Sequence, residues 1–549
     1  MYMPIKKTKY VVITGGVMSG IGKGIVTASI GKILQSLNKK VTIIKIDPYL
    51  NWDAGTMNPF QHGEVFVTID GVELDCDFGH YERMLDLQLL GNQNITTGQV
   101  YYEVISKERR GDFLGQTVQI IPHITDEIKR RINLVAKRSG AEVVIIEVGG
   151  TVGDIEGLPF LEAVRQLSLE VGRYNCLFVH VTFVPFPTHL REPKTKPTQH
   201  SVKELRSIGI DPSFIVCRSE NPVGKGPRRK IALFCNVEER AVFTLPDLDV
   251  VYEAPLVLDG QGLGQMIPEY LDFEEKKPEL LEWKETVDSF KNFEGEITIG
   301  MIGKYAELAD SYISINESLK HAGAVLKRRV NIDWVNSEDF EKDPYAIERL
   351  GKYAGILIPG GFGARGTEGK ILAIKFAREN NVPFLGICFG MQLATVEFAR
   401  NMAGLEGANS TELDQKSPHP VICILPEQVN VKNKGGTMRL GGYTAVITPG
   451  TKAYELYKTE KIVRRHRHRF EVNPEYIQIL EKNGLVFSGR SEDGRLMEIL
   501  ELPNHPFFFG TQFHPEFDSR PAKPEPAYLG FIKAAVEREL KTKIIEATS

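Results

Sequence analysis

The chain contains 549 residues, of which 42% are hydrophobic and 25% are charged, values that are typical of soluble globular proteins. Its length allows roughly two to four domains. The 67 basic and 71 acidic side chains give a formal net charge of −4, and this near balance argues against a bulk nucleic-acid binder. No run of about 18 apolar residues occurs, so we expect no transmembrane helix.

The six cysteines include no CxxC pair and no zinc-ligand spacing, which excludes a disulfide scaffold. Sparse cysteines and a polar N-terminus without the features of a signal peptide predict a cytoplasmic protein. One cysteine, Cys388, lies in a special sequence context. We expect the other five to be small buried apolar residues; they are Cys76, Cys176, Cys217, Cys235 and Cys423.

Short apolar runs alternate with helical patterns through the first half of the chain. This alternation predicts parallel βαβ units and a doubly wound α/β fold. The first run enters a glycine-rich turn and then a helix over residues 23–37. The predicted strands are 10–14, 41–46, 143–148, 177–184 and 214–217.

A second α/β unit begins after a charged segment that contains one amphipathic helical pattern. We therefore predict a domain over 1–272, a linker with a helix over 273–296, and a second doubly wound parallel-sheet domain over 297–540. Residues 420–442 are poorly periodic and are expected to form a mobile loop. The strands predicted for the second domain are 297–302, 355–358, 383–387 and 507–513.

The turn after the first strand, residues 14–24 (TGGVMSGIGKG), has the features of a phosphate-binding loop. Its glycines allow the backbone to approach phosphates, and the N–H groups of the following helix point towards the anion. Lys23 then reaches the terminal phosphates. The spacing differs from the standard loop, because five residues separate Gly16 from Gly22 and Gly24 replaces the hydroxyl residue. A glycine-rich turn without a ligand is the alternative.

Carboxylates are expected to bind Mg²⁺ because the loop lacks that hydroxyl. Asp77 lies beside a glycine, and Glu147 ends the strand 143–148, where α/β sheets bind ligands. Lys45 and the segment 194–199 (KTKPTQ) also follow predicted strands. An ordinary solvated loop is the alternative for each of them.

Cys388 lies in Gly386-Ile-Cys-Phe-Gly390, which has the form of a nucleophile elbow with cysteine in place of serine. The start of the following helix favours the reactive thiolate. His514 and Glu516 supply a base and a group that orients it. Residues 359–363 (PGGFG) and the N–H of Phe389 are candidates for an oxyanion hole.

A dense basic run, residues 464–469 (RRHRHR), suggests a nucleic-acid patch when it is taken alone. Because the run is only six residues long and residues 470–472 have the pattern of a continuing strand, we favour a role in binding carboxylate or phosphate groups.

Together these motifs resemble the CTP synthase family. The first half resembles its amidoligase domain through residues 14–24, 61–68 (QHGEVFVT), 79–83 (GHYER), 149–156 (GGTVGDIE) and 194–199. The second half resembles a triad-type, class I glutamine amidotransferase through 359–363, 386–392 (GICFGMQ) and 513–516 (FHPE). The resemblance implies that Cys388 releases ammonia from glutamine and that ATP phosphorylates UTP, which ammonia then converts to CTP.

The resemblance also implies site residues. The catalytic residues are Cys388, His514 and Glu516. ATP contacts are Gly20, Ile21, Gly22, Lys23, Gly24, Ile25, Lys45, Asp77 and Asp247. UTP or inhibitory CTP contacts are Ser19, Asp154, Ile155, Glu156, Lys194, Thr195, Lys196, Pro197, Thr198, Gln199 and Lys230. Glutamine contacts are Gly361, Phe389, Gly390, Met391, Gln392, Glu412 and Arg469. Metal ligands are Asp77 and Glu147.

By the same resemblance we expect a homotetramer, inhibition by CTP, and activation by GTP near residues 435–441. We also expect a channel that carries ammonia between the domains near His62. Gly20 occupies a position where the family often has a second serine.

The sequence leaves two other hypotheses about function open. One is a different ATP-dependent amidotransferase with the same module order, such as a cobyrinate diamide synthase; segments 61–68 and 194–199 favour UTP instead. The other is a non-enzymatic nucleotide switch with a degenerate glutaminase domain, against which the intact Cys388, His514 and Glu516 argue.

Overall fold

The computed structural model describes residues 8–58, 63–187, 192–274, 276–303, 309–428 and 435–548. Contacts divide the chain into unit 1, which comprises Met1–Asp53 and His80–Val287, and unit 2, which comprises Ala54–Gly79 and Asp288–Ser549. Residues 54–79 thus group with the C-terminal half, although they lie inside the predicted domain 1–272. None of the helices among the described residues is long and apolar enough to cross a membrane.

Unit 1 is built on a seven-stranded parallel sheet in the order β5-β2-β6-β1-β7-β8-β9. Its strands are rich in Val and Ile and almost wholly buried, as expected when helices cover both faces. The strands are β1 (Lys9–Gly15), β2 (Val41–Asp47), β5 (Asn94–Thr96), β6 (Val143–Val148), β7 (Cys176–Phe183), β8 (Phe214–Ser219) and β9 (Val242–Pro246).

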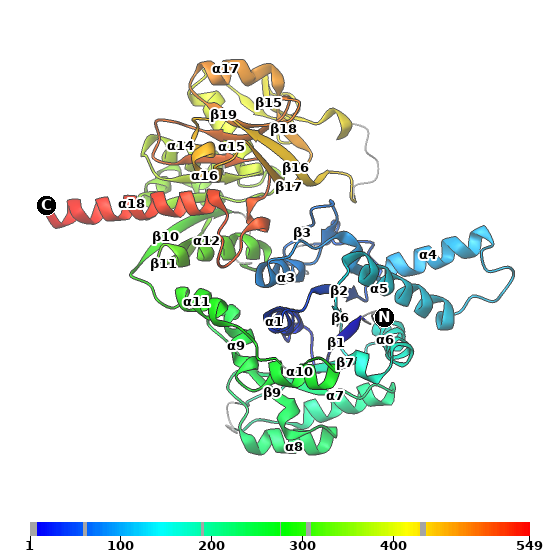
Figure 1. The fold of residues 1–549 in the computed structure, drawn as a ribbon. Helices are drawn as coiled ribbons and strands as arrows, with labels where there is room; N and C mark the ends of the chain where they lie inside the picture. The colour runs from blue at the N-terminus through cyan, green and yellow to red at the C-terminus, as the bar shows by residue number, and fades with distance from the viewer. Residues whose placement is uncertain are drawn as a thin grey trace, which may run out of the picture. The chain divides into compact units, whose positions relative to one another are not determined.

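Helices lie on both faces of this sheet, with α1 and α6 on opposite sides of β6 (Figure 1). Gly31 of α1 approaches Ile145, whereas Val144 and Ile146 point into a core with α5 and α6. The helices are α1 (Lys23–Ser36), α3 (Asp77–Leu85), α4 (Thr97–Arg110), α5 (Thr125–Ser139), α6 (Leu158–Val171), α7 (Lys196–Ser207), α8 (Lys225–Cys235), α9 (Ala254–Asp259), α10 (Leu263–Leu271) and α11 (Leu281–Ser289). The last is the helix predicted in the linker.

Unit 2 contains a nine-stranded sheet in the order β11-β10-β12-β13-β21-β20-β19-β16-β17. The strands from β11 to β21 are parallel, and those from β21 to β17 are antiparallel. These strands are β10 (Gly295–Gly303), β11 (Arg328–Asn336), β12 (Gly355–Ile358), β13 (Phe384–Ile387), β16 (Arg439–Ile447), β17 (Lys461–His468), β19 (Val486–Ser491), β20 (Met497–Glu501) and β21 (Phe508–Thr511). The α/β class is confirmed, and the antiparallel half is an addition to the predicted parallel sheet.

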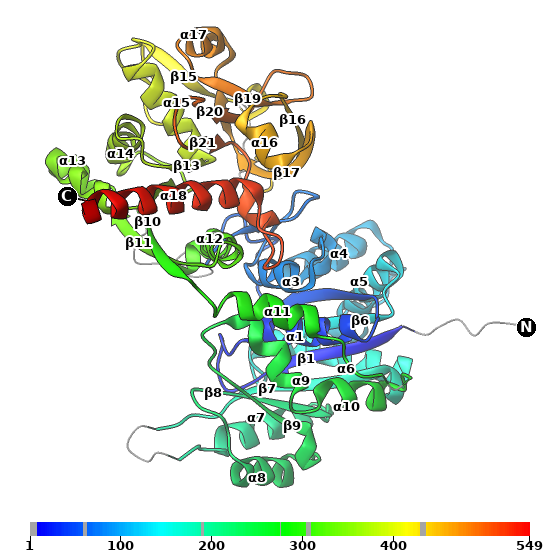
Figure 2. The ribbon, with the colours of Figure 1, turned by 60° about the vertical axis from the view of Figure 1, so that its left-hand side comes forward.

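Helices cover both faces of this sheet as well, with α14 and α15 on one face and α12 and α18 on the other (Figure 2). The helices are α12 (Ile313–Val325), α13 (Glu338–Lys342), α14 (Thr367–Glu379), α15 (Phe389–Asn401), α16 (Lys452–Tyr457), α17 (Ile477–Lys482) and α18 (Pro526–Thr548). Two smaller sheets complete the unit; their strands are β3 (Phe66–Val67) with β4 (Glu73–Leu74), and β14 (Ala408–Ser410), β15 (His419–Ile424) and β18 (Phe470–Val472).

Two expectations need correction. Residues 420–442 are not a loop throughout, because β15 covers the beginning and β16 starts at Arg439; both strands pair with neighbours, which supplies the order that weak periodicity concealed. The five remaining cysteines are not all core residues. Cys76 and Cys423 are partly exposed, whereas the other three are buried.

Candidate active sites

Cys388 lies on a sharp turn between β13 and α15. Its backbone has φ 49° and ψ −98°, a conformation that non-glycine residues rarely adopt and that is associated with functional sites. The residue caps the N-terminus of α15, where the helix dipole stabilises a negative charge. The local fold therefore presents this sulfur as a candidate thiolate nucleophile.

Cys388 is 4% exposed, and two neighbours fix the environment of its sulfur. Sγ donates to the carbonyl oxygen of Arg467 at 3.9 Å. The side-chain amide of Gln512 donates to Sγ at 3.6 Å. These two contacts hold the sulfur in a fixed position.

His514 and Glu516 form the second part of the candidate triad. Nδ1 of His514 donates to Oε1 of Glu516 at 2.7 Å. Burial alone lowers the pKa of His514, but the charges of Glu516 and Cys388, and hydrogen bonds to both, raise it to about 10. The imidazole is thus tied to carboxylate and sulfur together, as a cysteine–histidine pair requires.

The loop 359–363 lies against this histidine. A Cβ on Gly360 would come within 2.8 Å of Cε1 of His514, so the loop can approach the base closely because the residue is glycine. The N–H of Gly363 donates to Oε1 of Glu412 at 2.8 Å. The carboxylate of Glu412, a predicted glutamine contact, therefore lies in hydrogen-bond contact with the predicted oxyanion loop.

The other predicted glutamine contacts lie on neighbouring elements of unit 2. The amide of Gln392 donates to the carbonyl of Phe470 at 2.9 Å. Arg469 donates to Oε1 of Gln428 and, at 3.0 Å, to Oγ1 of Thr437. The first turn of α15 carries the remaining contacts, Phe389, Gly390 and Met391, and Gly361 belongs to the loop 359–363.

The basic run 464–469 is not an open cationic patch. Arg465 is fully buried and pairs with Asp518 at 3.4 Å. Arg464 lies 3.3 Å from Glu525, and Arg467 lies 2.7 Å from Glu73. Three of the four arginines thus bind carboxylates of this chain.

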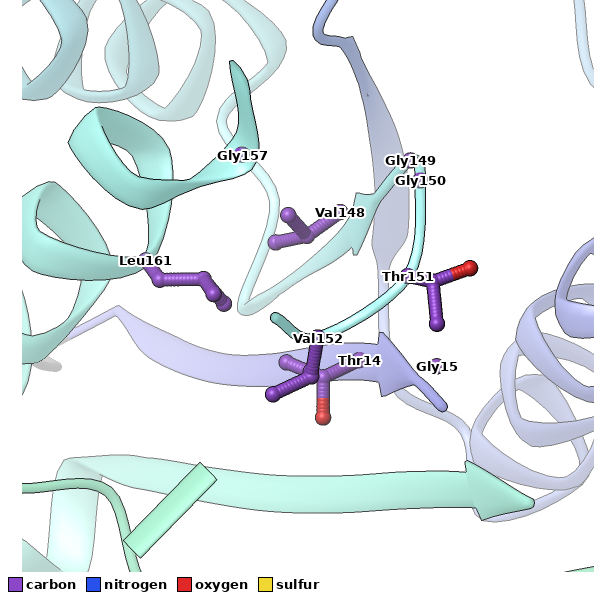
Figure 3. Close-up of a pocket in the computed structure, with 9 residues that line it drawn as sticks. All are labelled: Thr14, Gly15, Val148, Gly149, Gly150, Thr151, Val152, Gly157 and Leu161. Atoms are coloured by element: carbon purple, nitrogen blue, oxygen red, sulfur yellow. The ribbon is translucent and has the colours of Figure 1, made fainter. Parts of the chain in front are cut away.

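In unit 1 the predicted phosphate loop connects β1 to α1, as expected. The Lys23 side chain donates to the carbonyl of Gly150 at 2.7 Å. A Cβ on Gly16 would come within 1.5 Å of Oγ of Ser201, so this position excludes any side chain. A small pocket opens beside the loop between the ends of β1 and β6, and its lining includes Gly15 and Gly150 (Figure 3).

Glu147 is held by three neighbours at the carboxyl end of β6. It forms a buried ion pair with Lys45 at 3.0 Å. Thr27 and Tyr81 donate to its other oxygen at 2.8 and 2.6 Å. The predicted metal ligand is thereby fixed in place, and the predicted phosphate-binding lysine lies beside it.

Asp77 begins α3, and its N–H donates to the Asp75 carboxylate at 3.0 Å. Among the described residues, no group of three His, Cys, Asp or Glu side chains has the spacing of a metal site. Carboxylate oxygens are nevertheless the donors that Mg²⁺ prefers, and it usually takes one or two of them from the protein. The residue types at Asp77 and Glu147 therefore fit Mg²⁺.

The predicted nucleotide contacts follow the carboxyl ends of the parallel strands, which share one edge of the sheet. Ser19 to Ile25 follow β1, Asp154 to Glu156 follow β6, Lys194 to Gln199 follow β7, Lys230 lies on α8 after β8, and Asp247 follows β9. Two of these residues bond to each other at the start of α7, where the side chain of Gln199 donates to Oγ1 of Thr195 at 3.0 Å. His62, near which the channel was expected, lies outside the described residues.

Sequence reasoning missed two residues with direct contacts to these sites. Arg218, at the end of β8, donates to the carbonyl of Ile21 in the phosphate loop at 3.2 Å and pairs with Asp247 at 2.9 Å. Gln512 contacts the Cys388 sulfur. Both were detectable, because one is a cation at the end of a buried strand and the other precedes the Phe513-His514 pair.

Known proteins match both halves of the chain. Residues 9–273 match the family model for the CTP synthase N-terminus, and residues 307–534 match that for class-I glutamine amidotransferase. A CTP synthase of Methanopyrus kandleri is 59% identical over 529 residues, covering 96% of this chain and 99% of the relative. CTP synthases of Pyrococcus abyssi and Pyrococcus furiosus are 56% and 57% identical, each covering 96% of this chain and 98% of the relative. With the elbow cysteine, its histidine and the phosphate loop in place, these matches show that the chain belongs to the CTP synthase family.

Proposed function

We propose that this chain makes CTP from UTP, with ATP to activate the pyrimidine and glutamine to supply the nitrogen. Glutamine-dependent CTP synthesis is the activity of the family to which it belongs. The observation that carries the proposal is the arrangement of Cys388 on a strained turn with His514 and Glu516 hydrogen-bonded beside it.

In the glutaminase half, the Cys388 thiolate attacks the side-chain amide carbon of glutamine. The N–H groups of Gly361 and Phe389 stabilise the oxyanion. The His514 imidazolium gives its proton to the leaving nitrogen, the C–N bond breaks, and ammonia departs. Water then hydrolyses the thioester to glutamate, with His514 acting as base. Glu412 and Arg469 bind the ammonium and carboxylate of glutamine, and Gln392 assists.

In the synthetase half, the O4 atom of UTP attacks the γ-phosphorus of ATP, and ADP leaves. Ammonia then adds at C4, and phosphate departs to give CTP. Lys23 and Lys45 stabilise the charge on the transferring phosphoryl group. Ammonia is mostly protonated in neutral water, so we propose that it passes directly from one half to the other.

The predicted ligand contacts divide between the two nucleotides. Gly20 to Ile25 and Asp247 bind ATP, whereas Ser19, Asp154 to Glu156, Lys194 to Gln199 and Lys230 bind UTP or inhibitory CTP. Asp77 and Glu147 would hold Mg²⁺, which neutralises phosphate charge when it is bound. The domains 1–272 and 297–540 correspond to the two chemical halves.

Three further properties belong to the same proposal. GTP activates the glutaminase reaction near residues 435–441, four copies of the chain assemble, and the protein acts in the cytoplasm. The location is supported by six cysteines that form no disulfide. GTP-dependent glutamate release and the mass of the assembly in solution test the first two.

The decisive assay incubates the protein with UTP, ATP, Mg²⁺ and either glutamine or ammonia. We expect CTP with both nitrogen donors. Failure to form CTP from either donor, while glutamate is still released, would instead support another ATP-dependent amidotransferase such as a cobyrinate diamide synthase. Absence of both CTP and glutamate would support a non-catalytic nucleotide switch.

A further inference from the structure

The arginines of β17 hold a hairpin that comes from the other half of the sequence. This hairpin, residues 66–74, consists of β3, β4 and their connection, and it groups with unit 2 although it falls within the matched CTP synthase N-terminus. Arg467 donates to Oε1 of Glu73 at 2.7 Å. Arg465 donates to the carbonyl of Val67 at 3.1 Å, and its guanidinium lies 5.1 Å from the ring centre of Phe66.

The same two residues of β17 hold the candidate catalytic pair through their backbone. The Arg465 carbonyl accepts from the N–H of His514 at 2.8 Å. The Arg467 carbonyl accepts from the Cys388 sulfur at 3.9 Å. A shift of β17 would therefore move both reacting side chains. Each arginine contacts the hairpin through its side chain and the catalytic pair through its backbone carbonyl, and so connects the two.

A second connection runs through aromatic rings. Phe66 of the hairpin packs against Phe517, with ring centres 4.9 Å apart. Phe517 in turn stacks on the imidazole of His514, with centres 5.5 Å and planes 20° apart. Phe66 is fully buried, so its removal would leave a cavity behind the ring that orients the base.

The contacts of the hairpin with β17 and β16 fix its position in unit 2. Glu73 is 1% exposed, and a buried carboxylate that loses its partner carries a large desolvation cost. The backbone adds a further tie, since the N–H of Gly442 in β16 donates to the carbonyl of Ile69 at 2.8 Å. The hairpin is thus fixed to the edge strand β17 and to its neighbour β16.

We propose that the hairpin 66–74 is a positioning element of the glutaminase reaction, which sets the relative placement of Cys388 and His514 through β17 and through Phe517. The inference rests on the proposed glutaminase function. None of the hairpin residues touches the reacting atoms; they act through Arg465, Arg467 and Phe517. A segment of the matched synthetase sequence therefore completes the geometry of the glutaminase half.

The first test replaces Glu73 with Gln, which removes the charge at nearly constant shape. We expect kcat for glutamate release to fall about tenfold, with the KM for glutamine changed less than about threefold, because misplacement affects the reacting geometry more than substrate binding. The matched control is Glu492→Gln. It removes an exposed ion pair with Lys461, which lies on β17, the strand that also carries Arg467. It should leave both constants unchanged.

The second test uses Phe66→Leu, which keeps the hairpin apolar but removes the ring that contacts Phe517. The readout is the rate of Cys388 alkylation by iodoacetamide between pH 6 and 10, followed by mass spectrometry of the peptide. We expect a several-fold slower reaction and an altered pH profile in both hairpin variants. Circular dichroism establishes that they are folded, and if Glu73→Gln does not fold, Phe66→Leu decides.

The inference is overturned if the folded variants release glutamate within about threefold of the wild-type rate, or if alkylation of Cys388 is unchanged. The measurements distinguish a failure of the hairpin proposal from a failure of the proposed function. A wild-type protein that releases glutamate but makes no CTP from ammonia contradicts CTP synthesis and leaves the hairpin effect measurable. A wild-type protein that releases no glutamate contradicts both.

Discussion

The two candidate sites are organised differently. Around Cys388 the fold fixes a single reactive geometry, with a strained backbone, a helix start and a histidine bonded to Glu516. Around the phosphate loop the charged groups pair with the protein itself, since Lys23 donates to Gly150 and Lys45 pairs with Glu147. Covalent catalysis depends on the placement of a few atoms, whereas phosphate binding depends on charge delivered to one edge of a sheet.

This difference predicts that single substitutions divide the overall reaction. Changes at the elbow should remove one nitrogen donor and spare the other, whereas changes at the phosphate loop should remove CTP synthesis whatever the donor.

Cys388→Ala should lower glutamine-dependent CTP synthesis at least about 10³-fold, because no other group can form the thioester. Ammonia-dependent synthesis should stay within about twofold of wild type, as measured by CTP formation with each donor. Cys423→Ala changes a partly exposed cysteine in the same unit and should affect neither reaction. Loss of ammonia-dependent synthesis in a folded Cys388→Ala protein would contradict the division.

Lys23→Ala should lower CTP synthesis about 10²-fold or more with both donors, because the transferring phosphoryl group loses a fixed positive charge. Glutamate release should survive. Parallel assays of CTP and glutamate measure the two effects. Lys137→Ala removes an exposed lysine from α5 and should change neither. A fully active Lys23→Ala protein would show that residues 14–24 are a turn without a phosphate-binding role.

Glu516→Gln should lower the kcat of glutamate release about tenfold to 10²-fold, because the imidazole loses the carboxylate that orients it and raises its pKa. The wild-type pKa of about 10 exceeds the ordinary 6.5. The histidine therefore contributes unfolding free energy that is complete below about pH 6.5 and is lost as the pH rises through about 10.

Thermal unfolding at pH 6.5 and at pH 9.5 measures this contribution. Wild type should lose more stability over that interval than Glu516→Gln. Equal losses in the two proteins would mean that Glu516 does not hold a proton on His514.

Gly20→Ser should have the smallest effect and change the KM for ATP less than about threefold. No atom lies within 4 Å of a Cβ at this position, but its φ of 70° costs a side chain roughly 1–2 kcal/mol of local strain. Gly20→Ala carries the same strain without a hydroxyl. A lower KM for Ser than for Ala would show that the hydroxyl contributes to ATP binding, and a tenfold change would contradict the expectation.

Local sequence patterns predicted much of the fold. Val143 to Val148 and the helix from Lys23 were identified because buried parallel strands and strand-to-helix glycine turns have local signatures. The outer antiparallel half of the unit 2 sheet and the hairpin 66–74 were not, because long-range pairing stabilises them: β16 pairs with β19, which comes after β17 and β18 in the chain, and Arg467 pairs with Glu73.

The candidate sites show the same limit. The elbow around Cys388 was recognisable as a contiguous motif, and so were His514 and Glu516. The contact of Arg218 with Ile21 joins residues 197 positions apart, and that of Gln512 with Cys388 joins residues 124 apart. Arg218 and Gln512 each lie next to a predicted strand or motif, but no local pattern encodes the partner that each of them contacts.

The most direct test of the account follows the glutamine amide nitrogen. The protein is given UTP, ATP, Mg²⁺ and glutamine labelled with ¹⁵N at the amide, in the presence of excess unlabelled ammonium, and the CTP is analysed by mass spectrometry. We predict ¹⁵N-labelled CTP from wild type and unlabelled CTP from Cys388→Ala. Labelled CTP from Cys388→Ala, or none from wild type, would contradict the claim that Cys388 supplies the nitrogen of CTP.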